Sequence, residues 1–196
     1  MEILNLTNPF PHTIVYDFYN GDEQKLIWEE LLFLNKPGKM HSPEMTGDPA
    51  ASKNKKAIFL DRLYTDRNCS NILNVNRKIF TLIDHIEDMN ISNYLKYSDF
   101  DETMVSYYED GAYYDSHYDQ FVISAITTFW EEPKKFSGGD LVFTDFDYLP
   151  KMKNNTIIIF PSYVFHKVTP ISLRYNDGKS GRYTINQFYS IRQPNI

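Results

Sequence analysis

Residues 122–130, VISAITTFW, form a short segment rich in Val, Ile, Thr and aromatic residues. Five further segments of this kind lie on either side of it: ETMVSYY (102–108), DLVF (140–143), NTIIIF (155–160), HKVTPISLRY (166–175) and RYTINQFYSI (182–191). β-Branched and aromatic residues favour strands, and the turn signals SGG and NDGKSG separate some of the segments. Many short strands at this spacing predict a sandwich or jelly roll.

A helix is expected well ahead of this β-rich region, in NGDEQKLIWEELLFLNK (20–36). Asn20 and Glu23 have the spacing of a capping box, and Pro37 ends the pattern. Its apolar residues fall on one face: Ile27, Leu31 and Leu34. An extended piece, FPHTIVYDF (10–18), precedes this helix.

Three further features are expected before residue 100. Residues 37–56 have the composition of a long loop, which in a compact domain is more often a lid or binding loop than a plain connection. AIFLDRLY (57–64) resembles a strand, and residues 70–90 predict a second helix with Ser70 as its N-cap. The apolar stripe of that helix has six residues: Ile72, Val75, Ile79, Leu82, Ile83 and Ile86. Two helices ahead of the strands predict an α+β fold in which the helices pack against one sheet.

Length and composition limit the function classes. The 196 residues predict one domain, and no apolar run reaches the roughly 18 residues that span a bilayer. The N-terminus lacks the pattern of a signal peptide. Cys69 has no second cysteine to pair with, which favours a reducing, cytoplasmic setting. The net charge of −6 argues against non-specific nucleic-acid binding, which depends on phosphate neutralisation.

A candidate metal site lies in YYEDGAYYDSHYDQF (107–121), where one residue separates His117 from Asp119. On a strand, residues i and i+2 point to the same side, so the imidazole and the carboxylate would lie together. FPSYVFHKVTP (160–170) supplies a third candidate ligand, His166, on a later β segment. Two histidines and one carboxylate leave open positions on a metal, as in non-heme Fe(II) oxygenases. A structural zinc site is disfavoured, because such a site fills four positions, usually with cysteine, and this chain has one cysteine.

An H-x-D pair alone arises often by chance, and a fourth residue strengthens the hypothesis. Arg182 begins a strand segment 16 positions after His166. A buried arginine suits the carboxylate of a dicarboxylic acid. The 2-oxo acid end of 2-oxoglutarate could chelate iron while its far carboxylate pairs with this arginine. The other histidines are expected to be ordinary residues: His12, His41 and His85.

Together these features resemble the Fe(II)- and 2-oxoglutarate-dependent dioxygenases, and within them the prolyl 4-hydroxylase-like branch. The resemblance covers roughly residues 100–192. The family pattern Y-(x)n-G-x-x-Y-x-x-H-x-D is met by five residues: Tyr108, Gly111, Tyr114, His117 and Asp119. Three more segments resemble the Gly-Gly-acidic hairpin strand, the distal-histidine segment and the 2-oxoglutarate strand of the family: FSGGDLVF (136–143), TIIIFPSYVFHKVTPI (156–171) and RYTINQFY (182–189).

The resemblance implies a double-stranded β-helix, jelly-roll and cupin-like, in a single catalytic domain over residues 1–196 with its core at about 100–192. It implies Fe(II), 2-oxoglutarate and O₂, with ascorbate as a reductant. It assigns the iron to three ligands: His117, Asp119 and His166. It assigns the 2-oxoglutarate pocket to four residues: Tyr108, Thr128, Asn186 and the carboxylate clamp Arg182.

The clamp assignment has a competitor. In this branch the clamp usually follows the distal histidine by about nine to twelve positions, and Arg174 follows His166 by eight. We favour Arg182 because YNDGKSG (175–181) has the composition of a hairpin inserted between strands.

The expected substrate is a prolyl residue in a protein or peptide, covered by the loop 37–56. The alternative is a free amino acid or another small metabolite. A nucleic-acid demethylase of the AlkB type is disfavoured, because that group has a second arginine six positions after the first, where this chain has Phe188. A non-enzymatic metal-binding β-barrel would not explain Arg182 and Tyr108 beside the triad. No membrane partner is expected, and the oligomeric state is left open.

Overall fold

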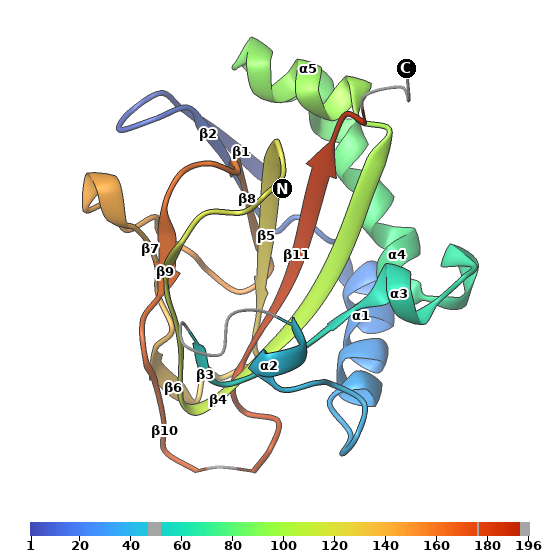
Figure 1. Ribbon diagram of the computed structural model, residues 1–196, viewed down its shortest axis with the longest axis vertical. Helices are drawn as coiled ribbons and strands as arrows, with labels where there is room; N and C mark the ends of the chain where they lie inside the picture. Colours follow the sequence, from blue (N-terminus) through green and yellow to red (C-terminus); the bar gives the residue numbers. More distant parts are fainter. Residues whose placement is uncertain (47–51, 176, 193–196) are drawn as a thin grey trace.

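The structure, a computed structural model, describes residues 1–46, 52–175 and 177–192. Within these residues one curled antiparallel sheet dominates the fold (Figure 1). Its strands lie in this spatial order: β1 (Glu2–Leu6), β2 (His12–Tyr16), β8 (Thr156–Pro161), β5 (Ile123–Phe129), β11 (Arg182–Ser190), β4 (Phe100–His117), β9 (His166–Val168) and β7 (Leu141–Phe143). β3 (Ser52–Phe59) adds to β4, and β6 (Phe136–Gly138) pairs with β10 (Ile171–Leu173) in a small second sheet.

The long strand β4 closes the fold. Its first part pairs with β11, from Ser190 opposite Phe100 to Arg182 opposite Tyr108. Gly111 then has a φ of +72°, which favours a residue without a side chain. Beyond it, the end of β4 pairs with β9. One strand therefore runs from one side of the curled sheet to the other, and the predicted jelly-roll architecture is confirmed.

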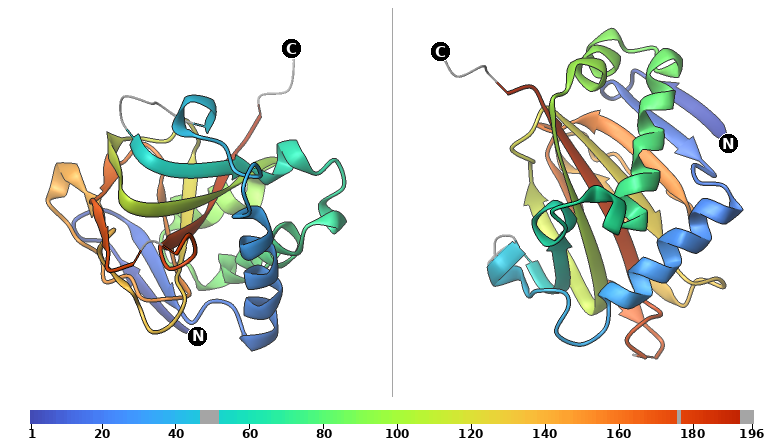
Figure 2. Two further views of the ribbon diagram at one scale, coloured as in Figure 1. Left: turned by 90° about the horizontal axis from the view of Figure 1, so that it is seen from below. Right: turned by 90° about the vertical axis from the view of Figure 1, so that its right-hand side faces the viewer.

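Helices cover one face of the sheet, opposite the side on which β7 and β9 lie (Figures 1 and 2). They are α1 (Gly21–Leu34), α4 (Asn71–Val75), the 3₁₀ helix Asn76–His85 and α5 (Met89–Tyr97). The capping box of Asn20 and Glu23 is present, and Ser70 caps α4 as predicted. The single helix predicted over 70–90 is wrong in part, because Ile86 ends the 3₁₀ segment and Asp88 caps a separate helix. No described helix is long and apolar enough to cross a membrane.

Strands at the centre of the sheet are buried on both faces. In β8, Ile157 and Ile159 pack in the core under the helices, whereas Ile158 and Phe160 pack on the opposite side with Phe143. Because side chains alternate along a strand, an unbroken apolar run satisfies both faces.

β11 alternates in the same way but is apolar on one side only. Tyr183 and Ile185 lie in the core under the helices. The residues between and beside them line a cavity on the other face: Arg182, Thr184, Asn186 and Phe188. The alternation thus separates a face of β11 that packs in the core from a face that lines the cavity.

Two predictions between the first helix and residue 70 need correction. The loop expected over 37–56 is shorter than predicted, because α2 (Pro43–Thr46) forms within it and β3 already begins at Ser52. Residues 47–51 of the expected lid lie outside the described part of the chain. The strand expected over 57–64 ends at Phe59, where the short helix α3 (Leu60–Leu63) follows. Pairing with β4, which residue composition does not report, decides where β3 begins.

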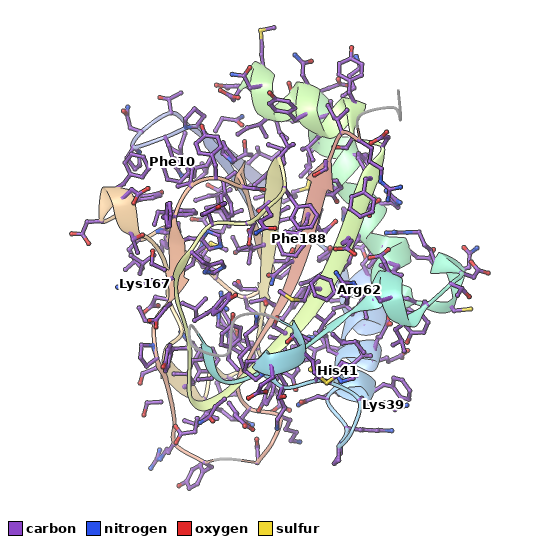
Figure 3. The ribbon with its side chains drawn as sticks, in the orientation of Figure 1. Phe10, Lys39, His41, Arg62, Lys167 and Phe188 are labelled. Atoms are coloured by element: carbon purple, nitrogen blue, oxygen red, sulfur yellow. The ribbon has the colours of Figure 1, made fainter. Side chains whose placement is uncertain are left out.

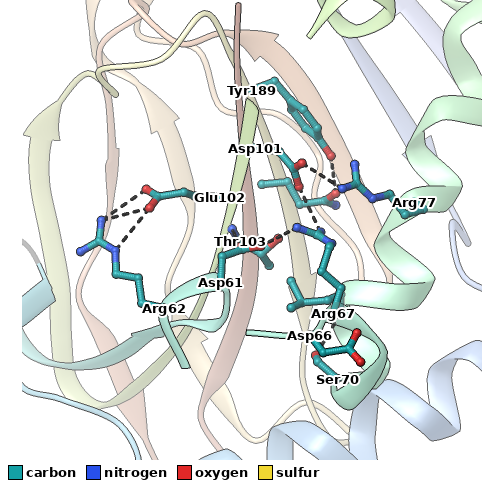
Figure 4. A network of polar contacts seen from close by, with 12 residues as sticks. Asp61, Arg62, Asp66, Arg67, Ser70, Arg77, Asp101, Glu102, Thr103 and Tyr189 are labelled. Carbon is teal, nitrogen blue, oxygen red and sulfur yellow. Dashed lines mark hydrogen bonds and ion pairs between the residues drawn. The ribbon is translucent and has the colours of Figure 1, made fainter. Parts of the chain in front are cut away.

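A polar network ties the turns after α3 to β4 and the 3₁₀ helix (Figure 4). Arg67, in the 3₁₀ turn Arg67–Cys69, pairs with Asp61 and with Asp101. Arg77 reaches the other oxygen of Asp101 at 3.0 Å. Asp61 also accepts a hydrogen bond from the backbone N–H of Thr103. Carboxylates thus link segments that are distant in sequence.

Gly138, at the end of β6, lies where the chain passes very close to another segment. Its φ is +68°, and a Cβ there would collide with the backbone carbonyl of Pro170. Gly178 has a similar φ of +74°, but nothing lies within 4 Å of a Cβ at that position.

The 3₁₀ turn Thr144–Phe146 completes the described helical segments.

Candidate active site

Two strand ends and a turn bring the three candidate ligands together. β4 ends at His117, and His117 is the register partner of His166 at the start of β9. Asp119 lies just past the end of β4, so the prediction that it shares a strand with His117 is wrong. Its backbone N–H donates to the carbonyl of Ser162 at 2.9 Å, which fixes this turn instead. One ligand atom of each residue lies within 4.8 Å of the others.

Both imidazoles are oriented by backbone carbonyls. Nδ1 of His117 lies 2.9 Å from the carbonyl oxygen of Asp115, and Nδ1 of His166 lies 3.0 Å from that of Val164. A carbonyl only accepts, so Nδ1 carries the hydrogen and Nε2 presents a lone pair. Each Nε2 lies 3.7 Å from an oxygen of Asp119. Burial lowers the pKa of both histidines to about 4, which keeps them neutral near pH 7, as a metal ligand must be.

A chain of two serine hydroxyls holds the carboxylate of Asp119 in place. Oδ2 accepts a hydrogen bond of 2.5 Å from the hydroxyl of Ser124, which also lies 2.8 Å from the hydroxyl of Ser162. Burial raises the pKa of Asp119, whereas the Ser124 hydrogen bond opposes the rise. A divalent cation beside the carboxylate would favour its charged form.

The triad opens onto a cavity of about 320 Å³ on the polar side of β11. Its walls are largely apolar or aromatic, with contributions from β3, β4, β9 and β11. Phe188 of β11 lies there (Figure 3). Its ring stacks on that of Phe121, with the ring centroids 4.8 Å apart. The charged residues among the described lining are three: Lys55, Asp119 and Arg182.

Arg182 lines the same cavity and is 2% exposed. Its guanidinium lies 5.3 Å from the ring centroid of Tyr108, and its Nη1 has no hydrogen-bond partner. No carboxylate of the described residues lies within 4.0 Å of it. A buried guanidinium left in this way is a site for an anionic ligand, because an unpaired buried charge is costly.

Arg174 is exposed and does not line the cavity. The hairpin expected over 175–181 is wrong, because β10 pairs with β6 whereas β11 pairs with β4 and β5. The segment connects two sheets instead of two paired strands. This connection between the two sheets lies between His166 and Arg182 and lengthens their separation in the sequence.

The remaining predicted pocket residues divide between two cavities. Tyr108 and Asn186 line the cavity of the triad, and burial raises the pKa of Tyr108 to about 12. Thr128 lies in a smaller neighbouring cavity of about 30 Å³, which also reaches Arg182. Its hydroxyl donates to the carbonyl of Lys153. Thr184 lines the main cavity with an unpartnered hydroxyl and was not predicted, although the alternation of RYTINQFY places it on the same face as Arg182.

A curled antiparallel sheet with a His/Asp/His cluster at one end of its cavity defines a jelly-roll protein that can hold a divalent metal and leave coordination positions open. Residues 103–190 match the family model described as the 2OG-Fe(II) oxygenase superfamily, which identifies a 2OG-Fe(II) oxygenase domain in this part of the chain. No curated protein gives a significant sequence match.

Solved structures share the fold at low sequence identity. A prolyl-4-hydroxylase from Pseudomonas putida superimposes with a TM-score of 0.65 at 17% identity, covering 93% of each chain. The viral collagen prolyl hydroxylase vCPH of Paramecium Bursaria Chlorella virus-1 gives 0.59 at 15% identity, covering 92% of this chain and 96% of its own. OsALKBH1 gives 0.61 at 14% identity, covering 96% of this chain and 100% of its own. These likenesses cover more than nine tenths of the chain, so the shared fold includes the N-terminal half.

Proposed function

We propose that the chain, residues 1–196, is one catalytic domain that hydroxylates a C–H bond with Fe(II) and 2-oxoglutarate. Its iron ligands are His117, Asp119 and His166. The observation that carries the proposal is the convergence of these three ligand atoms within 4.8 Å, in a cavity that also holds a buried guanidinium whose Nη1 has no hydrogen-bond partner.

The residues fit the metal and the co-substrate. Two neutral imidazoles and a carboxylate are the donor set of mononuclear non-heme iron sites with open positions. When bound, the iron couples O₂ and the oxidative decarboxylation of 2-oxoglutarate, which yields succinate and CO₂, to oxidation of the substrate. Ascorbate is the expected reductant that maintains Fe(II).

The protein positions the co-substrate and limits access of water. Arg182 supplies a two-pronged guanidinium to the far carboxylate of 2-oxoglutarate, and Tyr108 donates a hydrogen bond beside it. Asn186 lines the same pocket with a free Oδ1. Thr128 supports the pocket from the neighbouring cavity. The aromatic walls keep the reacting atoms away from bulk solvent.

The proposed substrate is a prolyl residue in a protein or peptide. The likeness to two prolyl hydroxylases supports this substrate class. An exposed aromatic pair also lies beside the ligands: Tyr118 and Phe165 are 51% and 39% exposed, with ring centroids 5.3 Å apart. Aromatic surfaces of this kind accept proline-rich chains, which are already ordered as polyproline II and lose little entropy on docking.

Two alternatives compete with the peptide. Hydroxylation of a free amino acid is favoured by the lysine inside the cavity, because such a substrate always carries a carboxylate. Nucleic-acid demethylation remains disfavoured, although OsALKBH1 shares the fold. The position of a second arginine is occupied by Phe188, and the net charge is −6.

Turnover of 2-oxoglutarate to succinate, with and without proline-containing peptides, tests the proposal. Wild-type protein should turn over 2-oxoglutarate with Fe(II), and a peptide substrate should raise the rate and gain one oxygen on proline by mass spectrometry. His117→Ala should abolish iron binding and turnover, whereas His85→Ala, exposed and remote, should not. Wild-type turnover in His117→Ala at saturating iron would refute the metal assignment. Hydroxylation of free proline without any peptide reaction would replace the substrate class.

A further inference from the structure

Lys55, which belongs to the segment predicted as a loop, lines the cavity. It is 2% exposed, although the neighbouring residues 54 and 56 are exposed. It is the register partner of Tyr108, which in turn is the partner of Arg182. Residues directly opposite each other on adjacent strands project to the same face. Lys55, Tyr108 and Arg182 therefore form one row across three strands spaced about 4.8 Å apart.

The ammonium of Lys55 lies on the side of the row nearer the triad. Its Nζ is 4.4 Å from the ring centroid of Tyr114, whose ring lies 4.0 Å from that of His117. Among the described residues, no acidic group lies within 4.0 Å of it. Burial lowers the pKa of Lys55 to about 8, while Asp119 opposes the drop. The neighbouring Lys56 points outward and pairs with Glu109 at 3.0 Å.

A count of charges over the described residues that line the cavity leaves one cation in excess. Iron brings two positive charges and 2-oxoglutarate two negative ones, while Asp119 and Arg182 contribute one of each sign. These four cancel. Among the described residues, no anion then balances the positive charge of Lys55 in this buried, largely apolar cavity, a costly arrangement unless an anion joins it.

We propose that Lys55 binds a carboxylate of the substrate that is hydroxylated, so that the enzyme prefers substrates with an acidic group next to the oxidised carbon. This inference rests on the proposed function and narrows its substrate class. The carboxylate belongs either to an acidic residue adjoining a proline in a peptide or to a free amino acid. The co-substrate is held at the other end of the row, by Arg182.

Paired probes that differ only in charge test the inference on wild-type protein. The peptide arm compares capped Asp-Pro and Pro-Asp dipeptides with capped Asn-Pro and Pro-Asn. The free-acid arm compares L-proline with L-prolinamide. Within the arm that stimulates 2-oxoglutarate turnover, the carboxylate member should be at least about tenfold more effective, as expected for a charge-assisted hydrogen bond. The responding arm identifies the source of the carboxylate.

Lys55→Met should erase this preference and leave the 2-oxoglutarate requirement of the unstimulated reaction within about twofold. The matched control Lys56→Met, one residue away on the opposite face, should retain the preference. Circular dichroism and thermal unfolding check that each variant folds. If Lys55→Met does not fold, the comparison of charged and uncharged probes on wild-type protein tests the inference without it.

Three results would overturn the inference: equal stimulation within every pair, no stimulation by any probe, or a Lys55→Met variant that keeps the preference while its 2-oxoglutarate requirement rises. In each case wild-type protein still turns over 2-oxoglutarate, so the proposed function stands. Loss of that basal turnover in wild-type protein would overturn the proposed function and, with it, this inference.

Discussion

Replacement of Arg182 by methionine tests the co-substrate pocket most directly. The guanidinium is 2% exposed and its Nη1 lacks a partner, so a bound carboxylate would complete a buried ion pair. Removing one member of such a pair typically costs about 3–5 kcal/mol. The dissociation constant of 2-oxoglutarate should therefore rise by at least about two orders of magnitude.

Thermal unfolding gives a readout that does not depend on catalysis. A ligand at about 100 times its dissociation constant stabilises the folded state by about 2.7 kcal/mol. For a chain of this size that corresponds to an increase in Tm of about 5–10 °C. In Arg182→Met, a hundredfold weaker affinity reduces the stabilisation at the same concentration to below about 0.5 kcal/mol, or under about 2 °C.

The experiment is anaerobic unfolding with Fe(II), with and without 2-oxoglutarate, followed by circular dichroism. Arg174→Met is the matched control, because Arg174 is exposed and outside the cavity, and it should keep the full shift. Without ligand, Arg182→Met should be no less stable than wild type, since it removes an unpaired buried charge. A full shift in Arg182→Met would refute the reasoning, and its loss in Arg174→Met instead would move the clamp to Arg174.

Three further predictions concern stability. In metal-free protein the pKa of His117 and of His166 is lowered from 6.5 to about 4, so the unfolded state binds more protons and the free energy of unfolding should fall as the pH drops from 6.5 to 4. Urea unfolding of His166→Gln with a chelator should show a shallower dependence of this free energy on pH than wild type, and an equal slope would contradict the shifts. Arg67→Ala should lower the free energy of unfolding by about 1–3 kcal/mol, because two partly buried carboxylates, Asp61 and Asp101, each lose one of their partners. The more exposed Arg77→Ala should cost under about 1 kcal/mol, and equal urea midpoints for the two variants would contradict this role of the network. Gly138→Ala should lower the free energy of unfolding by over about 1 kcal/mol more than Gly178→Ala does. Both glycines have a positive φ, but only a Cβ at Gly138 would collide with a backbone carbonyl. Equal losses in Tm would show that the backbone around Pro170 shifts to accommodate the methyl group.

Local chemistry made part of this protein predictable from its sequence. The capping box of Asn20 and Glu23 and the cap at Ser70 depend on neighbouring residues alone, and both are present. The unbroken apolar run of β8 indicated burial on both faces of that strand. The alternation of β11 separated core residues from residues that line the cavity, although both sets are buried. The spacing of His117 and Asp119, together with the family pattern, also indicated the candidate ligands, whose ligand atoms lie within 4.8 Å of one another in the structure.

Long-range pairing decided the rest. Asp119 reaches the triad from a turn held by Ser162, not from the alternation of a strand. Strand β3 exists because β4 offers hydrogen-bond partners to residues whose own composition predicts a loop. That pairing turns Lys55 inward, toward the cavity, and Lys56 outward, toward Glu109. A lysine has the same local propensities in both positions, so only the register between two distant strands determines which one becomes part of the site.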